Sequence, residues 1–299
     1  MTMPHDWKVH HKTRNIHVVE IEGVRPSEFE HWVLLSSDRH HDSTHADWDL
    51  ERKHLEEAVE RNATVLDCGD LFDCMGGKYD PRNSKGDIRA EYALAPDYLD
   101  AIVRDAARFY APYAKQFACI GRGNHETAIT KRHEVDLTER LCGAMSQISG
   151  VPVVASGYGG WVVFRARVWG TTEVNLRLRW FHGSGGGGPM SHGVLTTRRM
   201  ASWLPDADVV VSGHTHDHWH VKLMRERLVT AKGDYRIGLT EQHHVRTPSY
   251  KQEWNDGWGG WHVETGKPPK PQGAMWMKLT MSDTKHDGMR LIATFTEAN

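Results

Sequence analysis

The segment ADVVVSGHTH (residues 207–216) joins a short apolar run to two histidines, and two more histidines follow within the next four residues. The three consecutive valines are typical of a strand that is buried on both faces. Three interpretations explain so many imidazoles at the end of a buried strand: a metal site, a structural histidine cluster, or a solvated loop rich in histidine. Other parts of the sequence distinguish them.

Four further short apolar runs each lead to residues of the types that bind metals. They are HWVLLSS (31–37) with Asp38 and His40, ATVLDCG (63–69) with Asp70 and Asp73, QFACIG (116–121) with Asn124 and His125, and VNLRLRWFHG (174–183) with His182. In open α/β sheets, ligand sites collect just beyond the carboxyl ends of the strands. Five such clusters are therefore expected to meet in space, which favours the metal site.

The spacing and the residue types indicate which metals. Asp38 and His40, like His214 and His216, stand two residues apart, and such residues point to the same side of an extended segment. A carboxylate has lone pairs for two cations at once. Imidazole suits Zn, Mn, Fe and Ni, whereas carboxylate and amide oxygens suit Mn and Mg. We therefore expect two adjacent divalent ions, with Mn favoured and Zn, Fe, Ni or Mg as alternatives.

The order of the predicted elements indicates an α/β fold. Helical patterns at 49–62, 88–113, 133–148 and 191–204 alternate with short strands, a loop is predicted at 76–87, and later strands include 160–168, 274–281 and 289–295. Helices and strands alternate in the first half, and strands dominate the second. We expect a four-layer α/β/β/α sandwich of two mixed β-sheets flanked by helices.

No linker divides the chain, so residues 1–299 are expected to form a single domain. Its motif core covers 31–218, and an extension that is β-rich and also rich in Trp, Gly and Pro covers 219–299.

Composition limits the classes of partner. The chain of 299 residues has a net charge of -2, so no general electrostatic attraction to nucleic acid is expected. Its four cysteines form no CxxC pair, which is typical of reduced thiols in the cytoplasm. The polar N-terminus has no apolar signal segment, and no apolar run approaches the ~20 residues of a membrane span. We expect a cytoplasmic protein without a membrane partner.

The ordered motifs resemble those of the calcineurin-like metallophosphoesterase superfamily. They are SDRH (37–40), GDLFD (69–73), GNHE (123–126), FHG (181–183) and GHTH (213–216). All five stand in the superfamily's order, each after a predicted strand, and together they span more than half of the chain. The resemblance implies the layered fold expected above and a metal-dependent phosphoric ester hydrolase with two divalent metal ions.

The resemblance also implies a role for each motif residue. The first metal would be bound by Asp38, His40 and His216, the second by Asn124, His182 and His214, and Asp70 would bridge the two. His125 would protonate the leaving oxygen or stabilise charge on the phosphate. Asp73 would hydrogen-bond His125, hold its tautomer and raise its pKa. The nucleophile would be a metal-bridging hydroxide that attacks phosphorus in line.

Residues beside the motifs are candidates for substrate binding. We expect Asn124, Arg122 and His192 to contact the phosphoester, and Arg39, inside the first motif, to point the other way. Cys74-Met75 follows GDLFD where the protein serine/threonine phosphatases have Arg-Gly, which argues against that branch.

We therefore expect a phosphodiesterase or nuclease-like enzyme acting on a nucleotide, a cyclic nucleotide or nucleic acid. The alternatives are a phosphomonoesterase or nucleotidase of the same fold, and a non-catalytic binding scaffold. The intact set of seven ligand positions argues against the scaffold.

Overall fold

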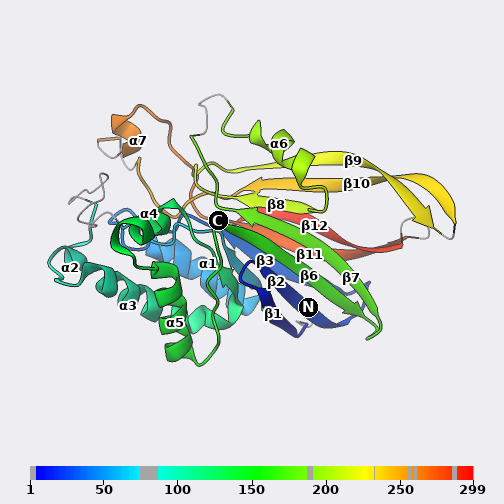
Figure 1. The fold of residues 1–299 in the computed structure, drawn as a ribbon, viewed down its shortest axis with the longest axis horizontal. Helices are drawn as coiled ribbons and strands as arrows, with labels where there is room; N and C mark the ends of the chain where they lie inside the picture. Colours follow the sequence, from blue (N-terminus) through cyan, green and yellow to red (C-terminus); the bar gives the residue numbers. More distant parts are fainter. Residues whose placement is uncertain are drawn as a thin grey trace.

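The computed structural model describes residues 5–74, 87–186, 191–231, 233–254, 257–258, 261–284 and 288–298. Their strands form two mixed sheets (Figure 1). The seven-stranded sheet has the order β1 (Trp7–Thr13), β2 (Ile16–Val24), β6 (Gly159–Val168), β7 (Thr172–Phe181), β8 (Val209–Ser212), β10 (Asp234–Arg246) and β9 (Trp219–Ala231). The five-stranded sheet has the order β12 (Gly288–Ala298), β11 (Ala274–Thr284), β3 (Glu30–Ser36), β4 (Thr64–Asp67) and β5 (Phe117–Ile120).

Burial along the strands reflects what covers each face. Every residue of β4, β5 and β8 is buried, as expected for short apolar strands covered on both faces. In β6, buried and half-buried residues alternate along the whole strand, because successive side chains point to opposite faces. The two patterns distinguish strands inside the layers from strands with one outward face.

The two sheets pack face to face over one apolar core. Val162, Phe164 and Trp180 come from the seven-stranded sheet, and Leu35 and Met277 come from the five-stranded sheet. All five side chains are buried. This packing holds the two sheets together, so that strand ends from both sheets can contribute to one site.

Helices cover the two outer faces unequally. The side of the five-stranded sheet carries α1 (Trp48–Glu60), α2 (Ala90–Ala93), α3 (Tyr98–Tyr110), α4 (Asn124–His133) and α5 (Leu137–Ser149) (Figure 1). On the other side, α6 (Thr196–Trp203) packs Met200 against Leu204, Ala207 and Val210. The expected α/β/β/α layering is confirmed, and in the described part of the chain its fourth layer is this one short helix.

Two elements differ from the expectation. The helix expected at 88–113 is interrupted between α2 and α3, because Pro96 disfavours a helical conformation of the residue before it. The polar N-terminal segment, for which no strand was expected, forms β1 and pairs antiparallel with β2. Trp7 and Val9 give β1 an apolar side that packs into the inter-sheet core.

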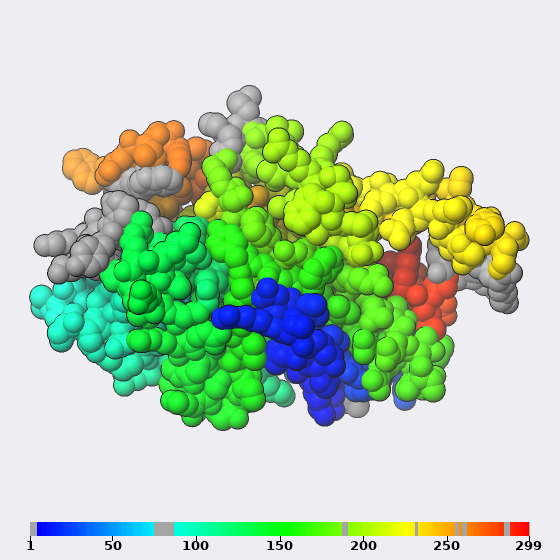
Figure 2. Space-filling model, in the orientation of Figure 1, coloured from blue at the N-terminus to red at the C-terminus, as the bar shows by residue number. Residues whose placement is uncertain are grey.

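Other parts of the chain lie at the periphery. The β9–β10 hairpin, yellow in Figure 2, extends to one end of the molecule, and α7 (Trp261–Glu264) lies towards the other end (Figures 1 and 2). Residues 76–86 of the predicted loop lie outside the described residues. Among the described helices, none combines the length and apolar character needed to span a lipid bilayer.

Parallel pairing brings the polar strand ends together. β3, β4 and β5 run parallel in one sheet, and β7, β8 and β10 run parallel in the other. The carboxyl ends of each set therefore share one edge of their sheet. Contacts between residues after β3 and after β8 show that the two edges meet: the backbone N–H of His214 donates to Asp38 Oδ2 at 2.8 Å.

The buried histidine His31, in β3, is expected to make the stability of the fold depend on pH. His31 is 4% exposed, and its Nε2 lies 2.9 Å from Thr64 Oγ1. Burial, together with the neighbouring His5, lowers the pKa of His31 to about 3. Below pH ~6.5 the unfolded chain binds a proton at His31, whereas the folded protein does not. The contribution of neutral His31 to the free energy of unfolding is therefore complete above pH ~6.5 and is lost as the pH falls towards 3.

We therefore predict that His31→Gln, which keeps a donor for Thr64, makes the unfolding free energy less dependent on pH. Urea denaturation of the metal-free protein between neutral pH and pH ~4.5 measures this, with a reduction in slope of up to about 1.4 kcal/mol per pH unit. Equal slopes for the variant and the wild type would contradict the assigned burial of a neutral ring.

Candidate metal centre

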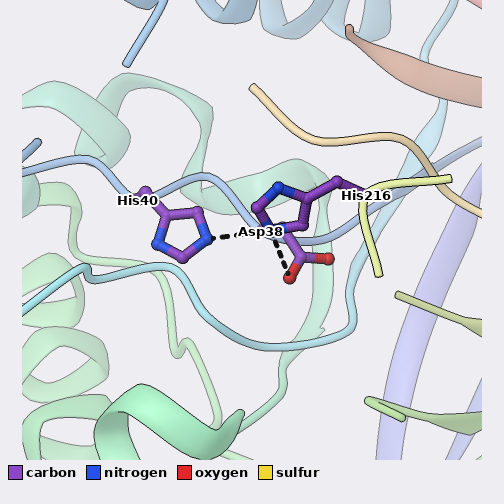
Figure 3. A group of neighbouring side chains, drawn as sticks. All are labelled: Asp38, His40 and His216. Carbon is purple, nitrogen blue, oxygen red and sulfur yellow. Dashed lines mark hydrogen bonds and ion pairs between the residues drawn. The ribbon is translucent and has the colours of Figure 1, made fainter. Parts of the chain in front are cut away.

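The first donor group consists of Asp38, His40 and His216 (Figure 3). Their ligand atoms all lie within 4.8 Å of one another. His216 Nε2 lies 3.3 Å from His40 Nε2 and 3.5 Å from Asp38 Oδ1. Asp38 Oδ1 is buried and accepts no hydrogen bond from the described residues. Two imidazole nitrogens and one carboxylate oxygen therefore face a common point.

The second donor group consists of Asp70, His182 and His214, whose ligand atoms also lie within 4.8 Å of one another. Asn124 Oδ1 joins them, 3.1 Å from His182 Nε2 and 2.7 Å from His214 Nδ1. His182 Nδ1 lies 3.0 Å from the Cys68 carbonyl oxygen, which accepts a proton held on Nδ1 and leaves Nε2 as the ligand atom.

The residues expected for each metal thus lie together in the expected partition. His214 and His216 belong to different groups although one residue separates them. Asp70 lies in the second group, with Oδ2 3.1 Å from His182 Nε2. Its role as the bridge between two ions, like the ligand roles of the other residues, stays a prediction.

The backbone at the ligand positions is not extended, which corrects one step of the sequence argument. Asp38, His40, Asp70, His214 and His216 all have positive φ, between 46° and 76°. This left-handed conformation is uncommon for residues other than glycine and costs of order 1–3 kcal/mol each. Asp38 and His40, like His214 and His216, face the site because tight loops turn them towards it, not because side chains alternate along a strand.

Glycines let the motif loops approach one another. A Cβ on Gly123 would overlap Asp70 Oδ1 and would lie 2.5 Å from the Asp70 backbone nitrogen. A Cβ on Gly213 would overlap the side chains of Ser37 and Asp38. The glycines of GNHE and GHTH therefore leave room for an aspartate from another strand end, which is the role they have in bringing the motifs together.

The electrostatics of the site favour positive charge. Burial alone would raise the pKa of Asp38 and Asp70, but nearby imidazoles hold both pKa values well below the usual range. Burial would lower the pKa of His182, but Asp70 outweighs it and raises that pKa to about 9. Burial, reinforced by His182, lowers the pKa of His214.

Two ionised carboxylates with imidazole neighbours are thus buried at one point, and charges in such a place need a partner. The mixed oxygen and nitrogen donors suit Mn, Zn, Fe or Ni. The residues present therefore fit a divalent cation in each donor group.

Asp73 contacts His125 through both its main chain and its side chain. His125 Nδ1 lies 2.5 Å from the Asp73 backbone carbonyl oxygen and 3.8 Å from the Asp73 carboxylate. The carboxylate also pairs with His40 Nδ1 at 2.8 Å and with Lys251 Nζ at 3.0 Å. The hydrogen bond to His125 comes from the Asp73 main chain, and the effect of the carboxylate on the pKa of His125 stays a prediction.

The candidate substrate-binding residues have the following surroundings. Arg122 forms an ion pair with Asp136, the residue that caps α5, so its guanidinium is engaged at a helix end and does not support the expected phosphate contact. His192 is half exposed, and its Nδ1 lies 3.1 Å from Asp217 Oδ1; its contact with substrate stays a prediction. Asn124 lies inside the second donor group.

Arg39 points away from the donor groups, as expected. It is fully buried, and its Nε donates to Asp67 Oδ2 at 2.6 Å while Nη1 pairs with Glu51. A buried arginine between two carboxylates ties the loop after β3 to β4 and α1.

Two site residues were missed by the sequence reasoning. Lys251 and Glu253 follow β10 in the segment SYKQEW, and they form ion pairs with Asp73 and with each other. Their segment has neither a ligand motif nor an informative spacing. Tertiary contacts bring them to the site: β10 pairs with β8, and Ser249 and Tyr250 donate hydrogen bonds to the Asp38 backbone carbonyl oxygen.

This chain is similar to known proteins in structure but not detectably in sequence. No protein-family profile matches the sequence, and no curated protein matches it. Among solved structures, the calcineurin-like phosphoesterase YfkN from Bacillus subtilis aligns with 11% identity and a TM-score of 0.41, covering 90% of this chain and 91% of that one. Vps29 from Chaetomium thermophilum aligns with 14% identity and a TM-score of 0.35, covering 89% and 95%.

GAP50, the anchor in the inner membrane complex of Plasmodium, aligns with 11% identity and a TM-score of 0.43, covering 90% and 85%. Identities of 11–14% and TM-scores below 0.5 say nothing about activity. The family resemblance rests instead on the layered fold and on the five motifs, which meet at one edge of the two sheets.

The layered fold and the order of the motifs agree with the resemblance to calcineurin-like phosphoesterases. The motifs follow β3, β4, β5, β7 and β8, with Asn124 and His125 in the first turn of α4, and each motif contributes to a donor group. The resemblance drawn from the sequence is therefore confirmed at the level of fold and motif placement.

The close approach at Gly123 predicts a large effect of one added methyl group. Gly123→Ala would push Asp70 out of its place in the second donor group. We expect affinity for Mn²⁺, measured by titration calorimetry, to fall by about tenfold or more, as for other changes that disturb the support of metal ligands.

Gly143→Ala is the matched control, because a Cβ at Gly143, within α5, meets nothing within 4 Å. It should bind Mn²⁺ as the wild type does. A Gly123→Ala protein that folds and also binds like the wild type would show that the Asp70 position is irrelevant to metal binding.

Proposed function

We propose that the chain is a phosphoesterase that uses two divalent cations to hydrolyse phosphodiesters of nucleotides or nucleic acids. The observation that carries this proposal is the proximity of two donor groups, Asp38–His40–His216 and Asp70–His182–His214, beside His125, which lies with His40 and Asp73 in a further group of possible ligands. Two metal ions, when bound, clamp phosphoryl oxygens and activate water. A single cation site or a structural histidine cluster would not need both groups.

We assign the transfer of a proton to His125. Its ring is 12% exposed, its backbone N–H donates to Asp70 Oδ1 at 2.9 Å, and its Nε2 lies 3.8 Å from Asp70 Oδ2. Because the Asp73 carbonyl accepts the proton on Nδ1, Nε2 is the atom directed at the donor groups. A protonated ring would deliver its proton from Nε2 to the departing oxygen.

The engaged arginines support a phosphodiester as the substrate. A phosphomonoester carries up to two negative charges at neutral pH, and a phosphodiester carries one. Arg39 is paired with Asp67 and Glu51, and Arg122 is paired with Asp136. Neither Arg39 nor Arg122 is thus free to neutralise a second phosphate charge, which favours the singly charged ester.

Turnover of bis-p-nitrophenyl phosphate and p-nitrophenyl phosphate with Mn²⁺ tests the reaction. We expect kcat/KM to be larger for the diester. The reverse order would indicate a phosphomonoesterase. Protein that binds Mn²⁺ by calorimetry but turns over neither ester would be a binding scaffold. A panel of cyclic nucleotides, RNA and single- and double-stranded DNA then separates the diesters.

His125→Ala should bind both ions but turn over about 10²–10⁴-fold more slowly, as expected for an acid–base residue. Calorimetry and the diester assay on the same preparation measure the two properties. If the variant lost its ions, His125 would have a structural role at the donor groups instead.

Asp70→Asn should lose both ions together if Asp70 bridges them, because one carboxylate then serves both positions. Asp208→Asn is the matched control, since Asp208 is a partly buried carboxylate immediately before β8, at the end opposite His214. Loss of one ion in Asp70→Asn, with the other retained, would assign Asp70 to a single metal.

A further inference from the structure

Lys251 places a buried ammonium beside the first donor group. Its side chain is 4% exposed, and its Nζ lies 3.0 Å from Asp73 Oδ1 and 2.9 Å from Glu253 Oε1. Lysine is almost never fully buried unless it is paired. Here the ammonium stands between two carboxylates, one from the loop after β4 and one from the segment after β10.

Each of these carboxylates faces the outward nitrogen of one histidine of the first donor group. Asp73 Oδ1 lies 2.8 Å from His40 Nδ1, and Glu253 Oε2 lies 3.8 Å from His216 Nδ1. The other ring nitrogens of the two histidines, both Nε2, lie 3.3 Å apart, and that of His216 lies 3.5 Å from Asp38 Oδ1. The two rings thus have carboxylates behind them and the candidate cation position in front.

Two carboxylates buried so close together would repel each other without a cation between them. Burial alone would lower the pKa of Lys251, but Asp73 and Glu253 outweigh burial and raise it, so the ammonium is charged. Lys251, within 3.0 Å of both carboxylates, therefore holds them in place behind the histidines.

We propose that Lys251 is a positioning residue that joins Asp73 and Glu253, so that the two carboxylates lie behind His40 and His216 and keep the Nε2 atoms of both rings directed at the first cation position. Carboxylates behind metal-binding histidines fix the tautomer and the orientation of the ring. The inference rests on the proposed function, because it assigns Lys251 and Glu253 to the first of the two metal positions.

The sign of the lysine effect distinguishes positioning from simple electrostatics. A nearby ammonium repels a divalent cation, so a lysine that acts only through its charge should weaken metal binding. Removing it would then tighten binding. A lysine that holds the two carboxylates should have the opposite effect, since its removal lets them separate and releases both rings.

The experiment measures Mn²⁺ binding by titration calorimetry and by electron paramagnetic resonance, without any substrate. The variants are Lys251→Met, Lys251→Arg and Glu253→Gln. Lys270→Met is the matched control, because Lys270 also forms a mostly buried pair with an aspartate, Asp217, that is in neither donor group. Thermal unfolding of each metal-free variant shows whether it folds.

We expect Lys251→Met and Glu253→Gln to weaken the first ion by about 10–100-fold and to leave the second unchanged. Lys251→Arg should recover most of the lost affinity, and Lys270→Met should bind both ions like the wild type. If Lys251→Met does not fold, Glu253→Gln and Lys251→Arg carry the test, and wild-type affinity of Glu253→Gln then overturns the proposal.

Three results would contradict the inference, and they differ from failure of the proposed function. Tighter binding in Lys251→Met would show that the lysine acts only by charge. Unchanged binding in Lys251→Met and Glu253→Gln would remove both residues from the metal position.

The third result is a further bound ion that is lost in both Glu253→Gln and His262→Ala. It would make Glu253 a ligand, since Glu253 Oε2 also lies 3.7 Å from His262 Nε2. Wild-type protein that binds no ion at all would instead refute the proposed function.

Discussion

The burial of Asp38 and Asp70 at a common edge of two sheets is the constraint on which the site depends. Neither residue is more than 2% exposed, and an ionised carboxylate in such a place requires compensation by nearby positive groups. Imidazoles supply it in this structure, and a divalent cation would supply more. The local backbone is arranged to keep these charges together: five ligand positions have a left-handed conformation, and Gly123 and Gly213 leave space for the opposing aspartates.

The buried arginine at position 39 helps to offset the strain of those loops. Arg39 lies between Asp38 and His40 in the sequence. Its guanidinium binds Asp67, Glu51 and Ser36 Oγ. A buried charge network of this kind is costly to break, because each group left unpaired would be a desolvated charge. The loop carrying Asp38 and His40 is thereby fixed to β4 and α1, which keeps the first donor group in place without any metal contact from Arg39.

Much of the donor set could be predicted from the sequence, because metal ligation uses few residue types and places them at strand ends. Short apolar runs before SDRH, GDLFD, GNHE and GHTH indicated buried strands, and parallel pairing then brought their ends together. The division of His214 and His216 between two groups also agreed with the resemblance. The left-handed backbone was not predicted, since the D-x-H and H-x-H spacings are equally compatible with an extended segment.

Partners that depend on tertiary packing could not be predicted. The spacing between Asp70 and Asp73 does not indicate which groups the Asp73 carboxylate contacts, and His40 and Lys251 lie closer to it than His125 does. Arg122 lies beside a ligand motif, but Asp136 at the start of α5 binds its guanidinium. Lys251 and Glu253 reach the site through the pairing of β10 with β8 and through hydrogen bonds from Ser249 and Tyr250 to the Asp38 backbone. Each of these contacts joins elements that are far apart in the chain.

The central claim is that two cations share this edge of the sheets, one in each donor group. Anomalous diffraction at the manganese edge from crystals grown with Mn²⁺ tests it most directly. The account predicts two peaks, one among Asp38, His40 and His216 and the other among Asp70, Asn124, His182 and His214, with an Asp70 oxygen in contact with both. A single peak, or peaks that contact neither group, would contradict it.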